Sequence, residues 1–234
     1  MSVLDKPLLA FHGDPAIKEF YLARVRAHRA ADDIVRGTYG SPKGSKSGWR
    51  GCAVGCSVHS GDHSAYEREM GIPVAIAWME DRLFERMPIE YAIDWPVEFL
   101  EVIPVGADLS LVIPKLLLRG IQDVRQYADD ATLPVINRVI EEVLEPRARG
   151  EAVPVDVVDA AARAAWAAYV AAADAAAWAA DAAADAAAGA ASRASRAADA
   201  ADAAAREAKA YEWSRWLLEL LRDAPVPEAA EGAL

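Results

Sequence analysis

Both cysteines of the chain and two of its four histidines lie close together, at Cys52, Cys56, His59 and His63. The spacing is C-x3-C-x2-H-x3-H. Thiolate sulfur and imidazole nitrogen are the ligands of most structural zinc sites. On a helix, the first three residues would share one face, because neighbours three and four positions apart face each other. We therefore predict a zinc site formed by these four residues, or by the first three and a nearby carboxylate.

A straight helix cannot supply all four ligands. Cys52 and His63 would lie about 16 Å apart along it, whereas zinc bonds sulfur and nitrogen at about 2.0–2.3 Å. The sequence therefore predicts a short helix, a break at Ser60-Gly61, where glycine permits a sharp turn, and a return of His63 to the ion.

Three other interpretations of this segment stay open. Both cysteines could be small buried apolar residues, as free cysteines often are. Cys52 could be a nucleophile at the start of a helix, with His59 or His28 as its base. The spacing also resembles that of iron–sulfur ligands, but His59 stands where a third thiolate is expected.

The segment before the cysteines, residues 37–51, contains five glycines and one proline. We therefore predict an irregular loop there. Lys43, Lys46 and Arg50 lie on it. Glycine-rich backbone with nearby cations suits an anion such as a nucleotide, although the P-loop pattern is absent. A flexible solvated loop is the alternative.

Composition excludes several classes of protein. The formal net charge is −11 and the isoelectric point is about 4.9. These values argue against a nucleic-acid binder and against attraction to anionic membranes. We find no apolar run long enough for a membrane span and no secretory signal. Two cysteines beside histidines fit a reducing cytoplasm better than a disulfide framework.

Helical periodicity dominates the pattern of apolar residues. Asp14-Pro15 has the form of a helix start, and apolar residues follow at helical spacing as far as Gly37. His28 and Asp32 lie four apart on this helix, as an ion pair or as additional site residues. Helices are also expected after Pro73 and over residues 132–149. No long period-two alternation occurs, so we predict an all-α fold with a helical domain over residues 1–150.

Residues 151–223 change character, because alanine, the best helix former, dominates. The other residues recur at steps of three and four through Gly189, which favours one long helix over a helical hairpin. Small side chains allow close packing of helices, so we expect homo-oligomerisation or a protein partner. Residues 224–234 are predicted to be a disordered tail.

Several segments, among them CAVGCSVHSGDHSAYE and DWPVEFLE, resemble a set of uncharacterised bacterial and phage-type proteins with an alanine-rich tail. The resemblance covers roughly residues 20–115 and implies no activity.

The sequence therefore favours a non-enzymatic binding or assembly protein with a structural zinc site and an alanine-rich assembly helix. Capture of an anionic small molecule by the 37–51 loop is one alternative. A cysteine- or metal-dependent hydrolase is the other.

Overall fold

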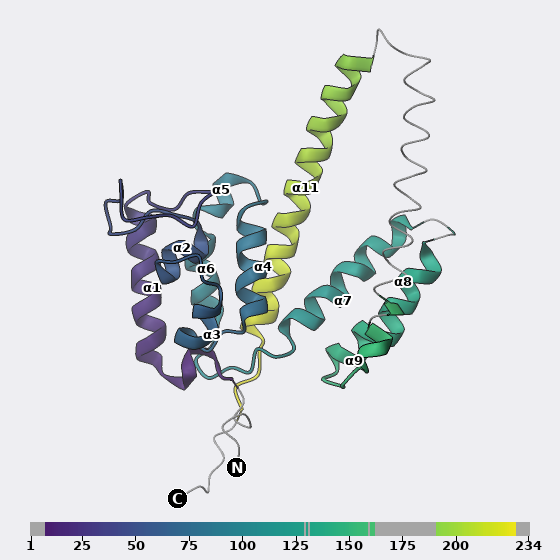
Figure 1. Cartoon of the computed structure of the whole chain (residues 1–234), viewed down its shortest axis with the longest axis horizontal. Coiled ribbons are helices and arrows are strands. Elements are labelled where there is room, and N and C mark those ends of the chain that lie inside the picture. The colour runs from purple at the N-terminus through teal and green to yellow at the C-terminus, as the bar shows by residue number, and fades with distance from the viewer. Residues whose placement is uncertain (1–7, 129, 131, 159, 162–190, 228–234) are drawn as a thin grey trace, which may run out of the picture. The chain divides into compact units, whose positions relative to one another are not determined.

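A computed structural model describes residues 8–128, 130, 132–158, 160–161 and 191–227 of the chain (Figure 1). This part of the chain consists of helices joined by loops. Three isolated β-bridges occur in it, and no strand is present. The predicted all-α class is confirmed. None of the described helices is both long enough and apolar enough to cross a membrane.

The chain divides into two compact units. The first contains the described parts of residues 1–113 and 206–234, and the second those of residues 114–205. The predicted domain boundaries at residues 150 and 223 stay a prediction.

Six helices of the first unit lie between residues 15 and 102. They are α1 (Pro15–Ala30), α2 (Ala53–Val58), α3 (Ser64–Met70), α4 (Val74–Phe84), α5 (Ile89–Ala92) and α6 (Trp95–Val102). The short helix α2 is buried at every position, because α1, α4 and α6 pack around it. The centre of this unit is therefore the segment that carries the two cysteines.

The ends of these helices follow from their sequences. Asp14 caps α1 by accepting a hydrogen bond from the backbone of Ala16, as predicted. However, α1 ends at Ala30 rather than near Gly37, because Asp32 adopts a left-handed conformation (φ 56°) and the chain turns inward at Asp33. Asp32 consequently lies beyond the helix and does not share its face with His28.

The C-terminal helix α11 (Ala191–Arg222) contributes its last turns to the first unit. Leu217 and Leu221 are fully buried there. Tyr211 stacks on Tyr91 of α5 with ring centroids 4.1 Å apart, and Arg215 pairs with Glu98 of α6 at 2.9 Å. These apolar and aromatic residues, which end the alanine-rich region, thus anchor the helix to its own chain.

The second unit contains most of α7 (Val112–Val124) and the helical segment formed by α8 (Leu133–Val139), a π-helical turn (Ile140–Leu144) and α9 (Glu145–Ala148). The helix predicted over residues 132–149 is thereby confirmed. Residues 162–190 of the alanine-rich segment lie outside the described residues, so the choice between one helix and a hairpin stays a prediction.

Candidate metal centre

Cys52, Asp81 and Glu85 bring one sulfur and two carboxylate groups to a common point. A ligand atom from each lies within 4.8 Å of the other two. Cys52 is the N-cap residue of α2 and is only 1% exposed. Asp81 lies in the last turns of α4 and Glu85 caps its C-terminus, so their spacing of four residues places both on one side of the helix. We refer to these three residues as the Cys52 centre.

Further contacts hold the two carboxylates in place. His63 Nε2 lies 3.2 Å from Asp81 Oδ2, and the Tyr39 hydroxyl lies 3.5 Å from the same oxygen. Asp81 Oδ1 is buried and has no hydrogen-bond partner. Glu85 accepts the backbone N–H of Gly37 at 3.0 Å from each oxygen. One carboxylate oxygen of the centre is therefore both desolvated and unsatisfied.

Without a cation, the surroundings disfavour negative charge on Cys52 and Glu85. Burial raises the pKa of the Cys52 thiol, and Asp81 and Glu85 raise it further. Burial likewise raises the pKa of Glu85, with Asp81 contributing. A site that gathers acidic groups in this way has most to gain from a bound dication, which stabilises the ionised forms of all three.

Aromatic rings fix the orientation of His63. The indole of Trp78 stacks on it with a centroid distance of 3.5 Å and an interplanar angle of 9°. The ring of Tyr39 meets it edge-on at 5.5 Å. His63 is only 3% exposed. This packing aims its Nε2 at Asp81, the arrangement in which an imidazole orients a carboxylate from outside a metal's own ligands.

The four predicted ligands are not gathered around one point. Cys56 is fully buried, and its thiol donates to the Gly51 carbonyl at 3.3 Å. Burial raises its pKa to about 12. His59 faces His28 instead, and His63 reaches the Cys52 centre only through Asp81. Of the predicted set, Cys52 alone belongs to a three-ligand group among the described residues.

The predicted helix break is present, but it lies earlier than Ser60-Gly61. The helix α2 ends at Val58, and His59 takes the left-handed conformation (φ 53°) that terminates it. Gly61 does not have a positive φ. Its role is steric, because a Cβ atom there would lie 2.9 Å from the ring of Tyr39.

The predicted anion site at the 37–51 loop is filled by the protein itself. The carboxylate of Asp33 accepts hydrogen bonds from the backbone amides of Lys46 and Ser47 at 2.9 and 2.8 Å, and from the hydroxyls of Ser45 and Ser47 at 2.9 and 2.6 Å. Burial opposes ionisation of this group, but these hydrogen bonds prevail and lower its pKa to about 2. The predicted cations Lys43, Lys46 and Arg50 point to solvent with exposed side chains.

A thiol nucleophile has little support in this geometry. Among the described residues, no hydrogen bond joins Cys52 to a histidine, and its nearest charged neighbours are acidic. Its predicted bases, His28 and His59, are hydrogen-bonded to each other at 2.9 Å. A reactive thiolate needs a cation or a base beside it, and here only a metal would provide one.

Glu80 is a second buried carboxyl group, next to the Cys52 centre in sequence but on the core face of α4. It is fully buried, and neither of its oxygens has a partner in hydrogen-bonding geometry. Burial raises its pKa to about 8, although the nearby Tyr66 hydroxyl acts in the opposite direction. Burial therefore favours the neutral form of this carboxyl group.

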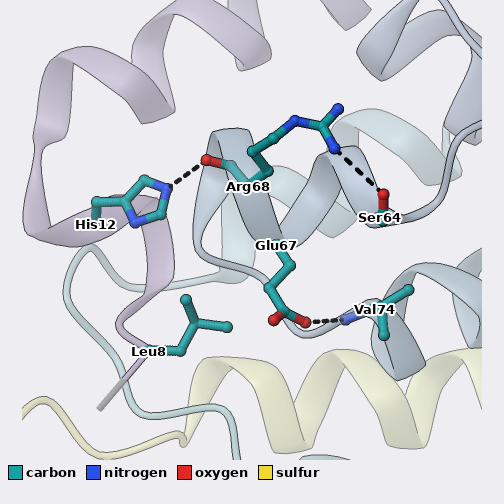
Figure 2. Close-up of a pocket in the computed structure, with 6 residues that line it drawn as sticks. All are labelled: Leu8, His12, Ser64, Glu67, Arg68 and Val74. Atoms are coloured by element: carbon teal, nitrogen blue, oxygen red, sulfur yellow. Dashed lines mark hydrogen bonds between the residues drawn. The ribbon is translucent and has the colours of Figure 1, made fainter. Parts of the chain in front are cut away.

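A surface pocket of about 550 Å³ is lined by Leu8, His12, Ser64, Glu67, Arg68 and Val74 (Figure 2). Its polar groups already have protein partners. His12 Nε2 bonds the Arg68 carbonyl at 3.2 Å, Glu67 accepts the Val74 amide at 3.3 Å, and Arg68 donates to Ser64. The side chains of His12, Glu67 and Arg68 are thus each engaged in at least one hydrogen bond within the protein.

The sequence predicted a nearby carboxylate as a possible ligand, but it did not single out Asp81 and Glu85 among the acidic residues. Acidic residues are frequent in the helix that follows Pro73, and an i, i+4 pair of carboxylates is common on solvated helices. Only the packing of α4 against α2 selects this pair, by bringing it to Cys52.

Comparison with known proteins gives no matching family model, no similar curated protein and no similar solved structure. The functional conclusion therefore depends on the geometry of the chain itself.

Proposed function

We propose that the protein binds one transition-metal dication, with zinc as the first candidate, through Cys52, Asp81 and Glu85. The observation that carries this proposal is the convergence of one sulfur and two carboxylates within 4.8 Å, from separate segments of the fold. The buried and unsatisfied Asp81 Oδ1 supports it, because an orphaned acceptor beside other ligands is a natural place for a cation.

Zinc accepts this mixture of ligands, since it bonds both thiolate sulfur and carboxylate oxygen. The Cys52 thiol must lose its proton to bind the metal, and its raised pKa makes that step unfavourable in the metal-free protein. Binding therefore releases a proton and weakens in acid. His63 orients Asp81 in this scheme, and we assign it no bond to the ion.

The role that we propose for the metal is structural. Cys52 precedes α2, whereas Asp81 and Glu85 belong to the end of α4. A shared ion would join these two segments, and an ion that binds only the folded chain stabilises it by mass action. The ligand set thus differs from the one predicted by sequence, but the class of function, a non-enzymatic binding protein, is the same.

Assembly through the alanine-rich region is the second part of the proposal, and its support comes from sequence. Light scattering of the purified chain tests it: a dimer or larger species is expected, and a strict monomer at high concentration would contradict it. Anion capture by Lys43, Lys46 and Arg50 is less favoured, because the amides of that loop already bind Asp33.

Elemental analysis and cobalt substitution test the metal site. We expect one zinc ion per folded chain, and Co²⁺ in its place should give the near-ultraviolet charge-transfer band of a cobalt–thiolate bond. Cys52→Ser should abolish that band and weaken zinc binding about tenfold or more. Cys56→Ser is the matched control, since this equally buried cysteine lies one helical turn away and outside the Cys52 centre. Equal loss in both variants, or no metal binding by the wild type, would refute the proposal.

A further inference from the structure

Two histidines share a single hydrogen bond between α1 and the end of α2. His28 Nε2 and His59 Nε2 lie 2.9 Å apart, and their rings meet nearly edge-on. His28 comes from α1 and is 1% exposed. His59 is the left-handed residue that ends α2. One nitrogen of the pair must donate and the other accept, so this contact requires a particular state of protonation.

The neighbouring groups determine which nitrogen donates. The ionised carboxylate of Asp33 can only accept, so the Ser47 hydroxyl donates to it at 2.6 Å. Ser47 Oγ then accepts from His28 Nδ1–H at 2.5 Å. A neutral imidazole carries one N–H, so His28 Nε2 is an acceptor and His59 Nε2–H is the donor. The result is a directional chain of hydrogen bonds from His59 through His28 and Ser47 to Asp33.

This chain holds the segment 45–49 of the glycine-rich loop against the two helices. Ser47 is bonded to His28 and Asp33, and the amide of Lys46 is bonded to Asp33. The indole of Trp49 stacks on His59, with a centroid distance of 5.4 Å and an interplanar angle of 9°. Two of the attachments of this segment therefore run through the histidine pair.

The pair can accept one proton but not two. A first proton can bind at His59 Nδ1 without disturbing the Nε2 contact. A second would have to bind at His28 Nε2, where it would face the N–H of His59 across 2.9 Å. Two donors and two positive charges would then oppose each other in a partly buried site. Separated histidines carry no such restriction, so the separated state binds one more proton than the closed state.

We propose that His28 and His59 form a latch that releases the segment 45–49 in acid. The charged groups that face the pair act as follows. Burial lowers the pKa of both histidines, and the guanidinium of Arg24 lowers them further. Asp33 and a backbone hydrogen bond at Trp49 favour a proton on His28. The open state binds the extra proton. The equilibrium constant for opening therefore increases by up to about tenfold for each unit that the pH falls below about 6.5.

Hydrogen–deuterium exchange of the metal-free full-length chain tests the latch without reference to zinc. Protection of the Lys46 and Ser47 amides, after correction for intrinsic exchange, should fall by about tenfold or more between about pH 7 and pH 5. Peptides from α6 should keep their protection. The Asp33 bonds cannot cause this change, because that carboxylate stays ionised until well below pH 4. A wild-type profile without a step in this range overturns the proposal.

A matched pair of variants attributes the step to the histidines. His59→Asn removes the titratable imidazole and suits the left-handed backbone, which asparagine tolerates. His12→Asn is the control, because His12 has nearly the same backbone conformation (φ 52°) but lies elsewhere. We expect the step to vanish in the first variant and persist in the second; a full step in His59→Asn overturns the proposal. If circular dichroism shows that His59→Asn is unfolded, His28→Gln replaces it with the same expectation. If neither variant folds, the wild-type profile decides.

Discussion

The carbonyl oxygen of Tyr39 lies 1.8 Å from the point that a Cβ atom on Gly55 would occupy. The backbone at Tyr39 therefore passes directly over the start of α2, and only glycine permits this approach. The consequence reaches the Cys52 centre, because the same approach brings the Tyr39 hydroxyl to within 3.5 Å of Asp81. Gly55, which lies between the two cysteines, thus permits the close approach of Tyr39 to α2.

Gly55→Ala should be among the most damaging single-methyl additions to this chain. The clash is with backbone, which cannot move aside without displacing the loop, so we expect a loss of at least about 3 kcal/mol in the free energy of unfolding. Gly61→Ala is the control, since its Cβ would meet only the side chain of Tyr39 at 2.9 Å. Urea denaturation measures both. Equal losses would show that the Tyr39 backbone is not held against α2.

Asp33→Asn should destabilise the fold because the ionised carboxylate organises the 37–51 loop. Hydrogen bonds to charged groups each contribute about 1.5–3 kcal/mol, so a loss of about that size is expected at neutral pH. Asp32→Asn is the control: this neighbour is exposed and left-handed, a conformation in which asparagine is well tolerated.

The difference in stability between wild type and Asp33→Asn should depend on pH, because the pKa of Asp33 is lowered in the folded chain. Its ordinary value is 3.8 and its folded value is about 2. The unfolded chain therefore binds more protons over this interval, and the stabilisation is present above about pH 4 and lost as the pH falls toward 2. Denaturation midpoints of wild type and Asp33→Asn should converge there. If the difference between the two midpoints is unchanged at low pH, the charge of Asp33 is not the cause of the difference in stability.

Glu80→Gln should leave stability nearly unchanged at acidic pH and increase it, relative to wild type, at alkaline pH. The folded pKa of about 8 lies above the ordinary value of 4.5, so the folded chain binds more protons between these values. Wild-type stability consequently falls as the pH rises through this interval, whereas the glutamine variant has no such term. Thermal melts at several pH values measure the difference in stability between wild type and Glu80→Gln. The control is Glu90→Gln, which changes an exposed acidic residue of α5. A difference in stability that does not increase with pH would show that Glu80 is solvated.

Zinc binding should release about one proton per ion at neutral pH, because the Cys52 thiol is protonated in the metal-free chain. Calorimetric titration in buffers of different ionisation enthalpy counts these protons. Cys56→Ser should leave the count unchanged, since Cys56 lies outside the centre. A count near zero for wild type would contradict thiolate ligation.

The sequence by itself determined the class of fold, the helix start at Asp14 and the irregular loop before the cysteines. These features are local. Periodicity, capping and the glycine content of residues 37–51 act over a few residues, so the pattern of side chains is sufficient to predict them.

The tertiary structure alone decided the partners of each chemical group. Cys52 and Cys56 are four residues apart and both are buried, yet one faces two carboxylates and the other faces backbone carbonyls. His59, which the spacing places with the cysteines, turns away to His28 because α2 ends one residue before it. The physical reason is that helical spacing fixes only which side chains share a face. What that face meets is set by packing between segments that are far apart in the sequence.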